Sequence, residues 1–158
     1  NPVEWTDVPP APQDIEHMGW YFDFPGSRER AVQDVTITGG YVILITNLPD
    51  SSPCSSAGSS FMHVLNACTG GRMNYPAIDL NGDGLLNSDD LVNVGSGANP
   101  VWVAPSGFKG AGMWYTPAII SLLDKSGDLA FSSTSEGTIE KIKLKADPVG
   151  MYYWREIN

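Results

Sequence analysis

The sequence predicts an all-β fold made of the antiparallel blades of a partial β-propeller, with an inserted EF-hand-like calcium loop and at most one short helix. Short runs of β-branched and aromatic residues alternate with glycine-containing turns. The same order of strands and turns occurs in both halves of the chain, as in a repeated blade. A β-sandwich is the alternative that this pattern leaves open.

The first half begins with residues 1–18, which hold four prolines and no periodic pattern and are interpreted as a connecting segment. Gly39 and Gly40 mark a tight hairpin turn before an uninterrupted apolar run, which is typical of a strand buried on both faces. A long loop is expected at residues 47–60. The strands expected in this half are residues 19–24, 35–37, 41–46 and 61–65.

The second half contains the strands expected at residues 117–123, 128–132, 138–144 and 151–156. Residues 138–144 alternate apolar and polar side chains, as a half-exposed or edge strand does. One short helix is expected at residues 88–94. Residues 19–158 are interpreted as the C-terminal part of a propeller with about two blades and the calcium loop between them. Two blades cannot close a ring, so we expect the remaining blades upstream or on another chain.

Composition narrows the possible functions. The 158 residues carry a formal net charge of −9, and this acidity disfavours binding to the phosphate backbone of nucleic acids. No apolar run reaches the length of a membrane span. The chain starts at Asn1 rather than Met, so we expect processing or truncation upstream. Cys54 and Cys68 fit either one disulfide or two free thiols.

One motif carries chemistry. Residues 79–90 fit the twelve-residue loop that binds Ca²⁺ through oxygen atoms of alternate residues. A glycine at the sixth position allows the positive φ of the sharp turn, and Leu85 at the seventh offers its carbonyl oxygen. Three carboxylates facing one dication predict moderate affinity, between micromolar and millimolar. The candidate ligands are Asp79, Asn81, Asp83, Leu85, Asn87 and Asp90.

The motif differs from a calcium switch, because its last position is an Asp and it stands alone without a second loop. A structural ion that holds a long insertion is favoured over a regulatory one, and a loop stabilised by its own hydrogen bonds is the alternative without metal.

No catalytic centre is predicted. His63 lies in the middle of an expected strand and is interpreted as a packed, hydrogen-bonded residue rather than a base. Neither a nucleophile motif nor a phosphate-binding glycine loop is present. Most aromatic residues are expected in the core. A partner- or sugar-binding patch of Trp102, Trp114 and Tyr115 is a weaker hypothesis.

Several segments, in this order, resemble the C-terminal β-propeller of the PilY/PilC proteins, which are type IV pilus tip-associated adhesins and assembly factors. No single motif is diagnostic, but the order is fairly specific and spans residues 19–158. The segments are GWYFDFP (19–25), RERAV (28–32), GGYVI (39–43), the Pro53-Cys54 loop, LNACTGGR (65–72), DLNGDG (79–84) and WREI (154–157).

This resemblance implies a non-enzymatic, secreted or surface protein at the pilus, which supports pilus assembly, retraction control and surface adhesion. It implies calcium at Asp79, Asn81, Asp83, Leu85 and Asp90. The partners it implies are the rest of the propeller, pilin or minor pilins, and a host or abiotic surface. Cys68 departs from the family pattern, which leaves the partner of Cys54 open.

Two other functions remain as alternatives. The Ala67-Cys68-Thr69-Gly70 strand ending also occurs in quinoprotein dehydrogenase propellers, but a vicinal cysteine pair is missing. Residues 79–90 are also nearly interchangeable with a dockerin loop, but a dockerin needs two such loops.

Overall fold

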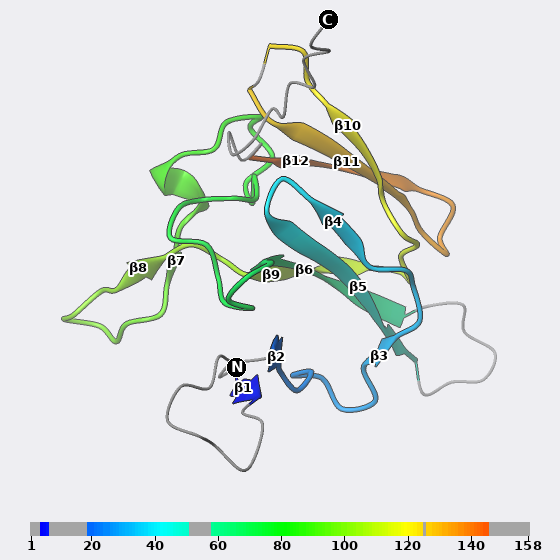
Figure 1. Cartoon of the computed structure of the whole chain (residues 1–158), viewed down its shortest axis with the longest axis horizontal. Helices are drawn as coiled ribbons and strands as arrows, with labels where there is room; N and C mark the ends of the chain where they lie inside the picture. Colours follow the sequence, from blue (N-terminus) through cyan, green and yellow to red (C-terminus); the bar gives the residue numbers. More distant parts are fainter. Residues whose placement is uncertain (1–3, 7–18, 51–57, 125, 146–158) are drawn as a thin grey trace, which may run out of the picture.

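The computed structural model describes residues 4–6, 19–50, 58–124 and 126–145, and in these residues the expected all-β, antiparallel architecture is confirmed (Figure 1). The strands are β1 (Glu4–Thr6), β2 (Gly19–Tyr21), β3 (Arg30–Ala31), β4 (Thr36–Thr38), β5 (Tyr41–Pro49), β6 (Gly58–Asn66), β7 (Val92–Asn93), β8 (Trp102–Val103), β9 (Gly107–Ala111), β10 (Ala118–Ser121), β11 (Asp128–Ser133) and β12 (Ile139–Leu144). One 3-10 helix, η1 (Ser88–Asp90), interrupts them. The strand expected at 151–156 lies outside the described residues.

The first sheet is built around the β5–β6 hairpin. Its register runs from Tyr41 opposite Asn66 to Pro49 opposite Gly58. β3 and β4 follow one another along the other edge of β5, and β9 pairs with β6. The loop expected at residues 47–60 is therefore shorter than predicted, because β-pairing continues through Pro49 and resumes at Gly58.

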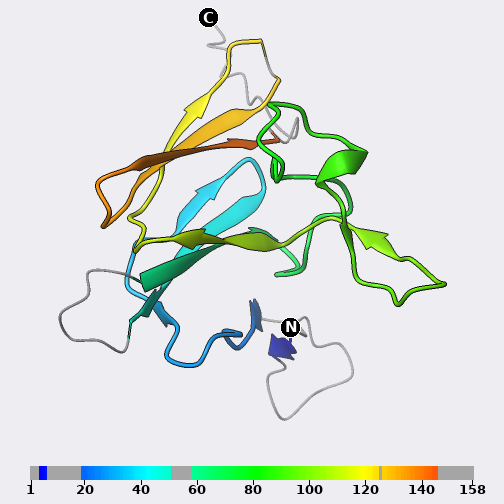
Figure 2. The same cartoon turned by 180° about the vertical axis from the view of Figure 1, so that it is seen from behind.

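The second sheet consists of β10, β11 and β12 in chain order, and it lies against one face of the first sheet (Figure 2). β12 is an edge strand whose burial alternates, as its sequence pattern predicts. A short segment from the first half joins this edge, since Ile78 forms an antiparallel bridge with Leu144. The backbone N–H of Asp79 donates to the Lys143 carbonyl oxygen at 3.0 Å.

The core lies between the two sheets. Alternate residues of β5 and β6 point toward the second sheet, in agreement with the period of two of a strand. β5 is buried on both faces, as its apolar run predicts. Burying a large apolar side chain such as Ile, Val or Met contributes roughly 1.5–3 kcal/mol to the free energy of unfolding. The core side chains are Tyr41, Ile43, Ile45, Met62, Val64, Met73, Ala77, Ile78, Trp114, Ala130, Ile142 and Leu144.

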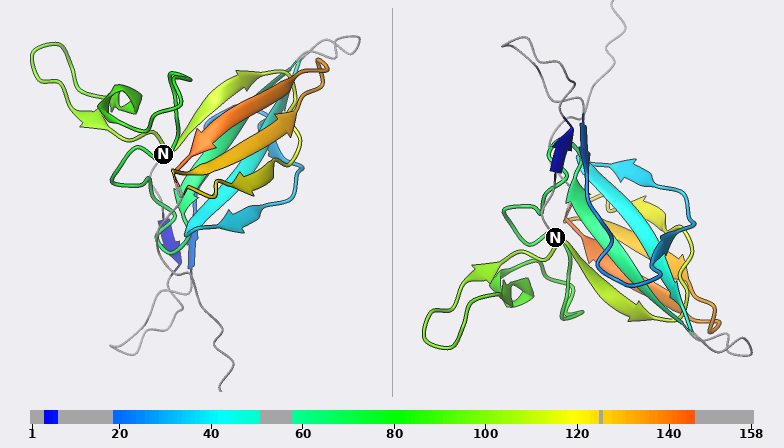
Figure 3. Two further views of the ribbon diagram at one scale, coloured as in Figure 1. Left: turned by 90° about the horizontal axis from the view of Figure 1, so that it is seen from above. Right: turned by 90° about the horizontal axis from the view of Figure 1, so that it is seen from below.

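The sequence patterns missed several strands, among them β9 and the two strands of the β7–β8 hairpin. β9 has two glycines among its five residues, so it lacks a strand signature. These glycines allow close packing, since a Cβ at Gly110 would lie 2.2 Å from the Trp114 ring. The β7–β8 hairpin has only two residues in each strand and projects from the side of the molecule (Figure 3).

The position of the 79–90 loop also differs from the prediction. Because β9 completes the first sheet, the loop is inserted between β6 and β9 rather than between the two sheets. The helix expected at residues 88–94 is limited to η1, because Leu91 is extended (φ −78°, ψ 145°) and leads into β7. At the other end of the chain, Glu4–Thr6, from the segment interpreted as connecting, pair with β2.

Candidate metal site

The loop of residues 79–90 starts at the edge of the second sheet and ends in η1, beside the base of the β7–β8 hairpin (Figure 1). Ile78, immediately before it, is fully buried, so the loop is fixed to the core at its first residue. Of the candidate ligands, Asp79 and Asn87 are half-buried, Asp90 is buried, and the others are exposed.

Asp79 curls the first half of the loop around its own carboxylate. Its Oδ1 accepts the backbone N–H of Gly82 at 2.7 Å, and its Oδ2 accepts that of Gly84 at 2.8 Å. Gly84 has φ of +80°, a backbone conformation that L side chains rarely adopt. The glycine expected to make the sharp turn therefore does so.

Asn81 and Asp83 continue the curl. Asn81 Oδ1 accepts the N–H of Asp83 at 2.9 Å, and Asp83 Oδ1 accepts the N–H of Leu85 at 2.7 Å. The Asn81 amide also donates to Asp83 Oδ2 at 3.2 Å. Both side chains bond to groups of the loop itself, and both residues are exposed, so their oxygens lie outside the core.

Asp90 holds the two ends of the loop together. Its Oδ1 accepts the N–H of Leu80 at 2.8 Å, and its Oδ2 accepts the N–H of Asn87 at 3.0 Å. Asn87 in turn accepts the N–H of Asp89 at 2.7 Å and caps η1. The side chain of Asp90 is fully buried, so both ends depend on a carboxylate shielded from water.

The donor set suits a hard cation. Each carboxylate oxygen that accepts one N–H bond has a second lone pair, and Ca²⁺ takes six to eight such oxygens. Within the described part of the chain, no three His, Cys, Asp or Glu side chains converge as they would around a metal ion. Carboxylates brought that close repel one another unless a cation lies between them. The six candidate ligands thus share one curled loop, and their convergence on one point remains a prediction.

One cation contacts this loop. Lys143, on β12 of the second sheet, donates from Nζ to the carbonyl oxygen of Gly84 at 2.9 Å. Among the described residues, no Lys, Arg or His forms an ion pair with Asp79, Asp83 or Asp90. The acidic side chains of the loop are therefore held by backbone N–H groups rather than by positive charges.

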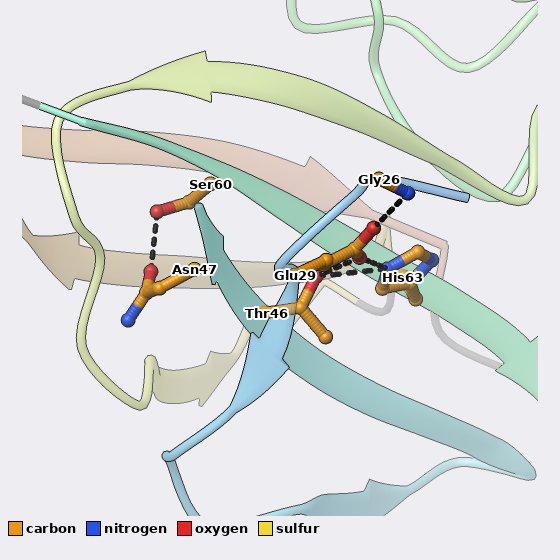
Figure 4. A network of polar contacts seen from close by, with 6 residues as sticks. All are labelled: Gly26, Glu29, Thr46, Asn47, Ser60 and His63. Carbon is orange, nitrogen blue, oxygen red and sulfur yellow. Dashed lines mark hydrogen bonds and ion pairs between the residues drawn. The ribbon is translucent and has the colours of Figure 1, made fainter. Parts of the chain in front are cut away.

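A second polar cluster lies on the face of the first sheet that points away from the second sheet (Figure 4). The Glu29 carboxylate is buried against β5 and β6. It accepts bonds from the Gly26 N–H at 2.7 Å and from the Thr46 hydroxyl, and its Oε1 lies 3.1 Å from His63 Nε2. The interpretation of His63 as a packed, hydrogen-bonded residue is confirmed.

This cluster is not arranged as a catalytic relay. The same ring nitrogen, His63 Nε2, contacts both Glu29 and, at 3.1 Å, the Thr46 hydroxyl. A relay needs one imidazole nitrogen for the acid and the other for the nucleophile. Sequence reasoning missed Glu29 and Thr46, and the only available signal was a polar Thr at the end of a buried apolar strand.

The proposed aromatic patch is wrong in one member. Trp114 is 3% exposed and packs in the core, where its Nε1 donates to the Ala111 carbonyl at 2.7 Å. Trp102 and Tyr115 are exposed, at 60% and 54%. Cys68 is exposed and free, and Cys54 lies outside the described residues.

An apolar groove of about 860 Å³ opens on the face of the first sheet that carries His63. Its lining includes Phe61 of β6, Phe108 of β9 and valines of the β7–β8 hairpin. No helix in the described part of the chain is long and apolar enough to cross a membrane.

No family model matches the sequence. The chain is 30% identical to type IV pilus biogenesis factor PilY1 of Pseudomonas aeruginosa (strain PAK) over 92 residues, which cover 56% of the chain and 8% of that protein. It is 32% identical to the PilY1 homolog of Xylella fastidiosa over 99 residues, with the same two coverages of 56% and 8%. The chain thus spans less than a tenth of these relatives.

The fold also has a solved counterpart. The crystal structure of the Pseudomonas aeruginosa PilY1 C-terminal domain superposes with a TM-score of 0.58 at 21% identity, over 82% of this chain and 23% of that one. The sequence and fold comparisons together confirm the resemblance noted from the sequence motifs.

Proposed function

Because the chain is homologous to PilY1 and shares the fold of part of the PilY1 C-terminal domain, we propose that it is a calcium-binding, non-enzymatic module of a type IV pilus-associated protein. The observation that carries this proposal is the 79–90 loop, in which alternate side chains with hard oxygen atoms line one tight curl.

The residues proposed to hold the ion are Asp79, Asn81 and Asp83 through side chains, Leu85 through its carbonyl oxygen, and Asn87 and Asp90 where the loop closes. When bound, calcium would supply positive charge to a loop that otherwise concentrates acidic groups. Since the loop lies in the segment between β6 and β9, and its first residue, Asp79, donates to the Lys143 carbonyl of β12, we propose a structural role for the ion, holding this insertion to both sheets.

The similarity to PilY1 supports a proposal for the role in the cell. We propose that the module lies at the cell surface or on the pilus, where it supports pilus assembly, control of retraction and adhesion. Its proposed partners are the remaining blades of the propeller, pilin or minor pilins, and a host or abiotic surface.

Calorimetric titration of chelator-treated protein with CaCl₂ tests the proposal. We expect one saturable site with a dissociation constant between micromolar and millimolar, and its loss in Asp83→Ala. Asp89→Ala removes the same charge from an exposed neighbour outside the proposed ligand set and should bind as the wild type does. Calcium should also raise the melting temperature, because binding stabilises the folded state by about 2.7 kcal/mol when the calcium concentration is a hundredfold above the dissociation constant.

The absence of binding up to about 10 mM, beyond the range of extracellular calcium modules, would contradict the calcium site. Equal loss in Asp83→Ala and Asp89→Ala would instead indicate nonspecific attraction to an acidic surface.

A further inference from the structure

The contact between Lys143 and the 79–90 loop is unusual, because it places a positive charge of one sheet on an insertion of the other. The Lys143 side chain is half-buried, and its Cε would lie 3.2 Å from a Cβ at Gly127. Its stem therefore passes over the β10–β11 turn before Nζ reaches the Gly84 carbonyl oxygen. Because the stem is packed in this way, the contact belongs to the fold and is not one of many conformations of an exposed lysine.

The backbone fixes the position of Lys143 relative to the loop. The N–H of Asp79 donates to the Lys143 carbonyl, and the N–H of Lys145 donates to the Ala77 carbonyl, both at 3.0 Å. Ala77 and Ile78 are fully buried and Leu144 is 1% exposed. The first ligand position and the lysine thus belong to one rigid antiparallel pairing.

The carbonyl that Lys143 contacts adjoins the proposed ligands. Gly84 lies between Asp83 and Leu85, and its own N–H donates to Asp79 at 2.8 Å. An ammonium held there partly neutralises the loop carboxylates and repels a dication that approaches them. On the turn that Lys143 crosses, hydrogen bonds from Ser126 and, to a smaller extent, the charge of Lys143 lower the pKa of Asp124.

We propose that Lys143 is an internal counter-cation that lowers the calcium affinity of the 79–90 loop. This inference rests on the proposed calcium site and adds the residue that sets its affinity. The lysine stabilises the acidic loop by its charge and by its bond to Gly84, and it opposes the ion by repulsion. Calcium affinity would therefore depend on the side chain of the second sheet that lies over the loop.

The test is calcium calorimetry of the full chain with Lys143→Met, which removes the charge and keeps the apolar stem. We expect the dissociation constant to fall roughly three- to tenfold at low ionic strength, and the difference to shrink in about 0.5 M KCl. Lys143→Arg, which keeps charge and donor, should bind as the wild type does. Lys141→Met is the matched control, since Lys141 is exposed two residues earlier on β12, and it should change affinity less than about twofold.

Lys143→Gln provides a second variant if Lys143→Met folds poorly, because the amide still offers a donor to the Gly84 carbonyl but carries no charge. Tighter binding in both neutral variants supports the proposal. Unchanged or weaker binding in the neutral variants, with normal binding by the wild type, overturns the role of Lys143 and leaves the calcium site intact. No binding by any variant would remove both.

Discussion

Glu29 and Asp90 are both buried acids, and they are held in different ways. Glu29 accepts from Thr46 and contacts His63, which are 17 and 34 residues away in sequence. Asp90 accepts only backbone N–H groups of its own loop, none more than ten residues away. The Glu29 cluster therefore ties distant segments together, whereas the 79–90 loop organises itself.

This difference separates a structural polar cluster from a candidate ion site. Around Glu29, hydroxyl and imidazole groups occupy the space that a ligand would need, and its Oε1 is shared between two side chains. In the loop, N–H bonds orient the carboxylates, and each Asp79 oxygen accepts one such bond, which leaves a further lone pair for a cation. Burial alone therefore does not identify a functional acid, whereas the nature of its partners does.

The largest effect is expected from a substitution that disrupts the Glu29 cluster. Glu29→Ala leaves the Gly26 N–H, the Thr46 hydroxyl and His63 Nε2 without their shared acceptor in a buried site. We expect the free energy of unfolding to fall by about 3 kcal/mol, measured by urea denaturation. Glu29→Gln retains an acceptor oxygen and should lose less. A loss below about 0.5 kcal/mol in Glu29→Ala would show that the cluster does not hold the segment to the sheet.

A smaller effect is expected from Asp90→Ala, which frees the N–H groups of Leu80 and Asn87 at the two ends of the loop. We expect a loss of about 2 kcal/mol in calcium-free buffer, by the same denaturation. The matched control is Asp89→Ala at an exposed position, with an expected change below about 0.5 kcal/mol. Equal losses in the two variants would show that the effect comes from net charge and that the hydrogen bonds of Asp90 do not hold the loop together.

Gly84→Ala tests whether the curl itself is required. No atom lies within 4 Å of the position that its Cβ would take, so the cost arises from φ of +80° alone. We expect a loss of about 1 kcal/mol in thermal unfolding, together with weaker calcium binding. Gly71→Ala, where a Cβ meets only the Thr69 hydroxyl oxygen at 3.6 Å, should change stability by less than about 0.5 kcal/mol. If Gly84→Ala changes neither stability nor calcium binding, the loop does not require the positive φ at this residue.

The smallest effect concerns Asp124. Hydrogen bonds from the backbone and side chain of Ser126 lower the pKa of this carboxyl below its ordinary value of 3.8, and the charge of Lys143 adds to the same shift. A lowered folded-state pKa contributes stability above the unfolded pKa, and this stability is lost as the pH falls through the folded pKa.

Ser126→Ala removes the side-chain hydrogen bond and keeps the backbone one, so an NMR titration of the Asp124 carboxyl should give a pKa that rises in this variant. The pKa should rise less in Lys143→Met, because the charge of Lys143 is a smaller cause of the shift than the Ser126 side chain. A larger rise in Lys143→Met than in Ser126→Ala would show that the charge of Lys143, rather than the Ser126 side chain, is the larger cause of the shift.

Much of the fold could be predicted from local patterns. The apolar run of β5, the Gly39-Gly40 turn and the alternation of β12 identified three strands, because side-chain period and turn chemistry are local properties. β9 could not be found this way, since its glycines are selected by close contact with Trp114 and Met62. The helix at 88–94 was overestimated, because Val92 and Asn93 pair as β7 with β8.

The candidate site shows the same limit. The spacing of Asp79, Asn81, Asp83 and Gly84 was sufficient to predict the curl. The side chains of the first three each accept a backbone N–H two to five residues further along the chain. The spacing did not show that Asp90 closes the loop from a buried position, or that Lys143 reaches it. The contact with Lys143 needs the second sheet in place, because Lys143 lies on β12.

The sequence by itself determined the all-β class, the hairpin turns and the oxygen-rich loop, because these depend on residues close together in the chain. Only the tertiary structure decided that the loop is an insertion of the first sheet, that Trp114 is core, and that Glu29 meets His63. Each of these depends on packing between segments far apart in sequence. Such packing is set by the close fit of side chains in the core and by the need of buried polar groups for hydrogen-bond partners.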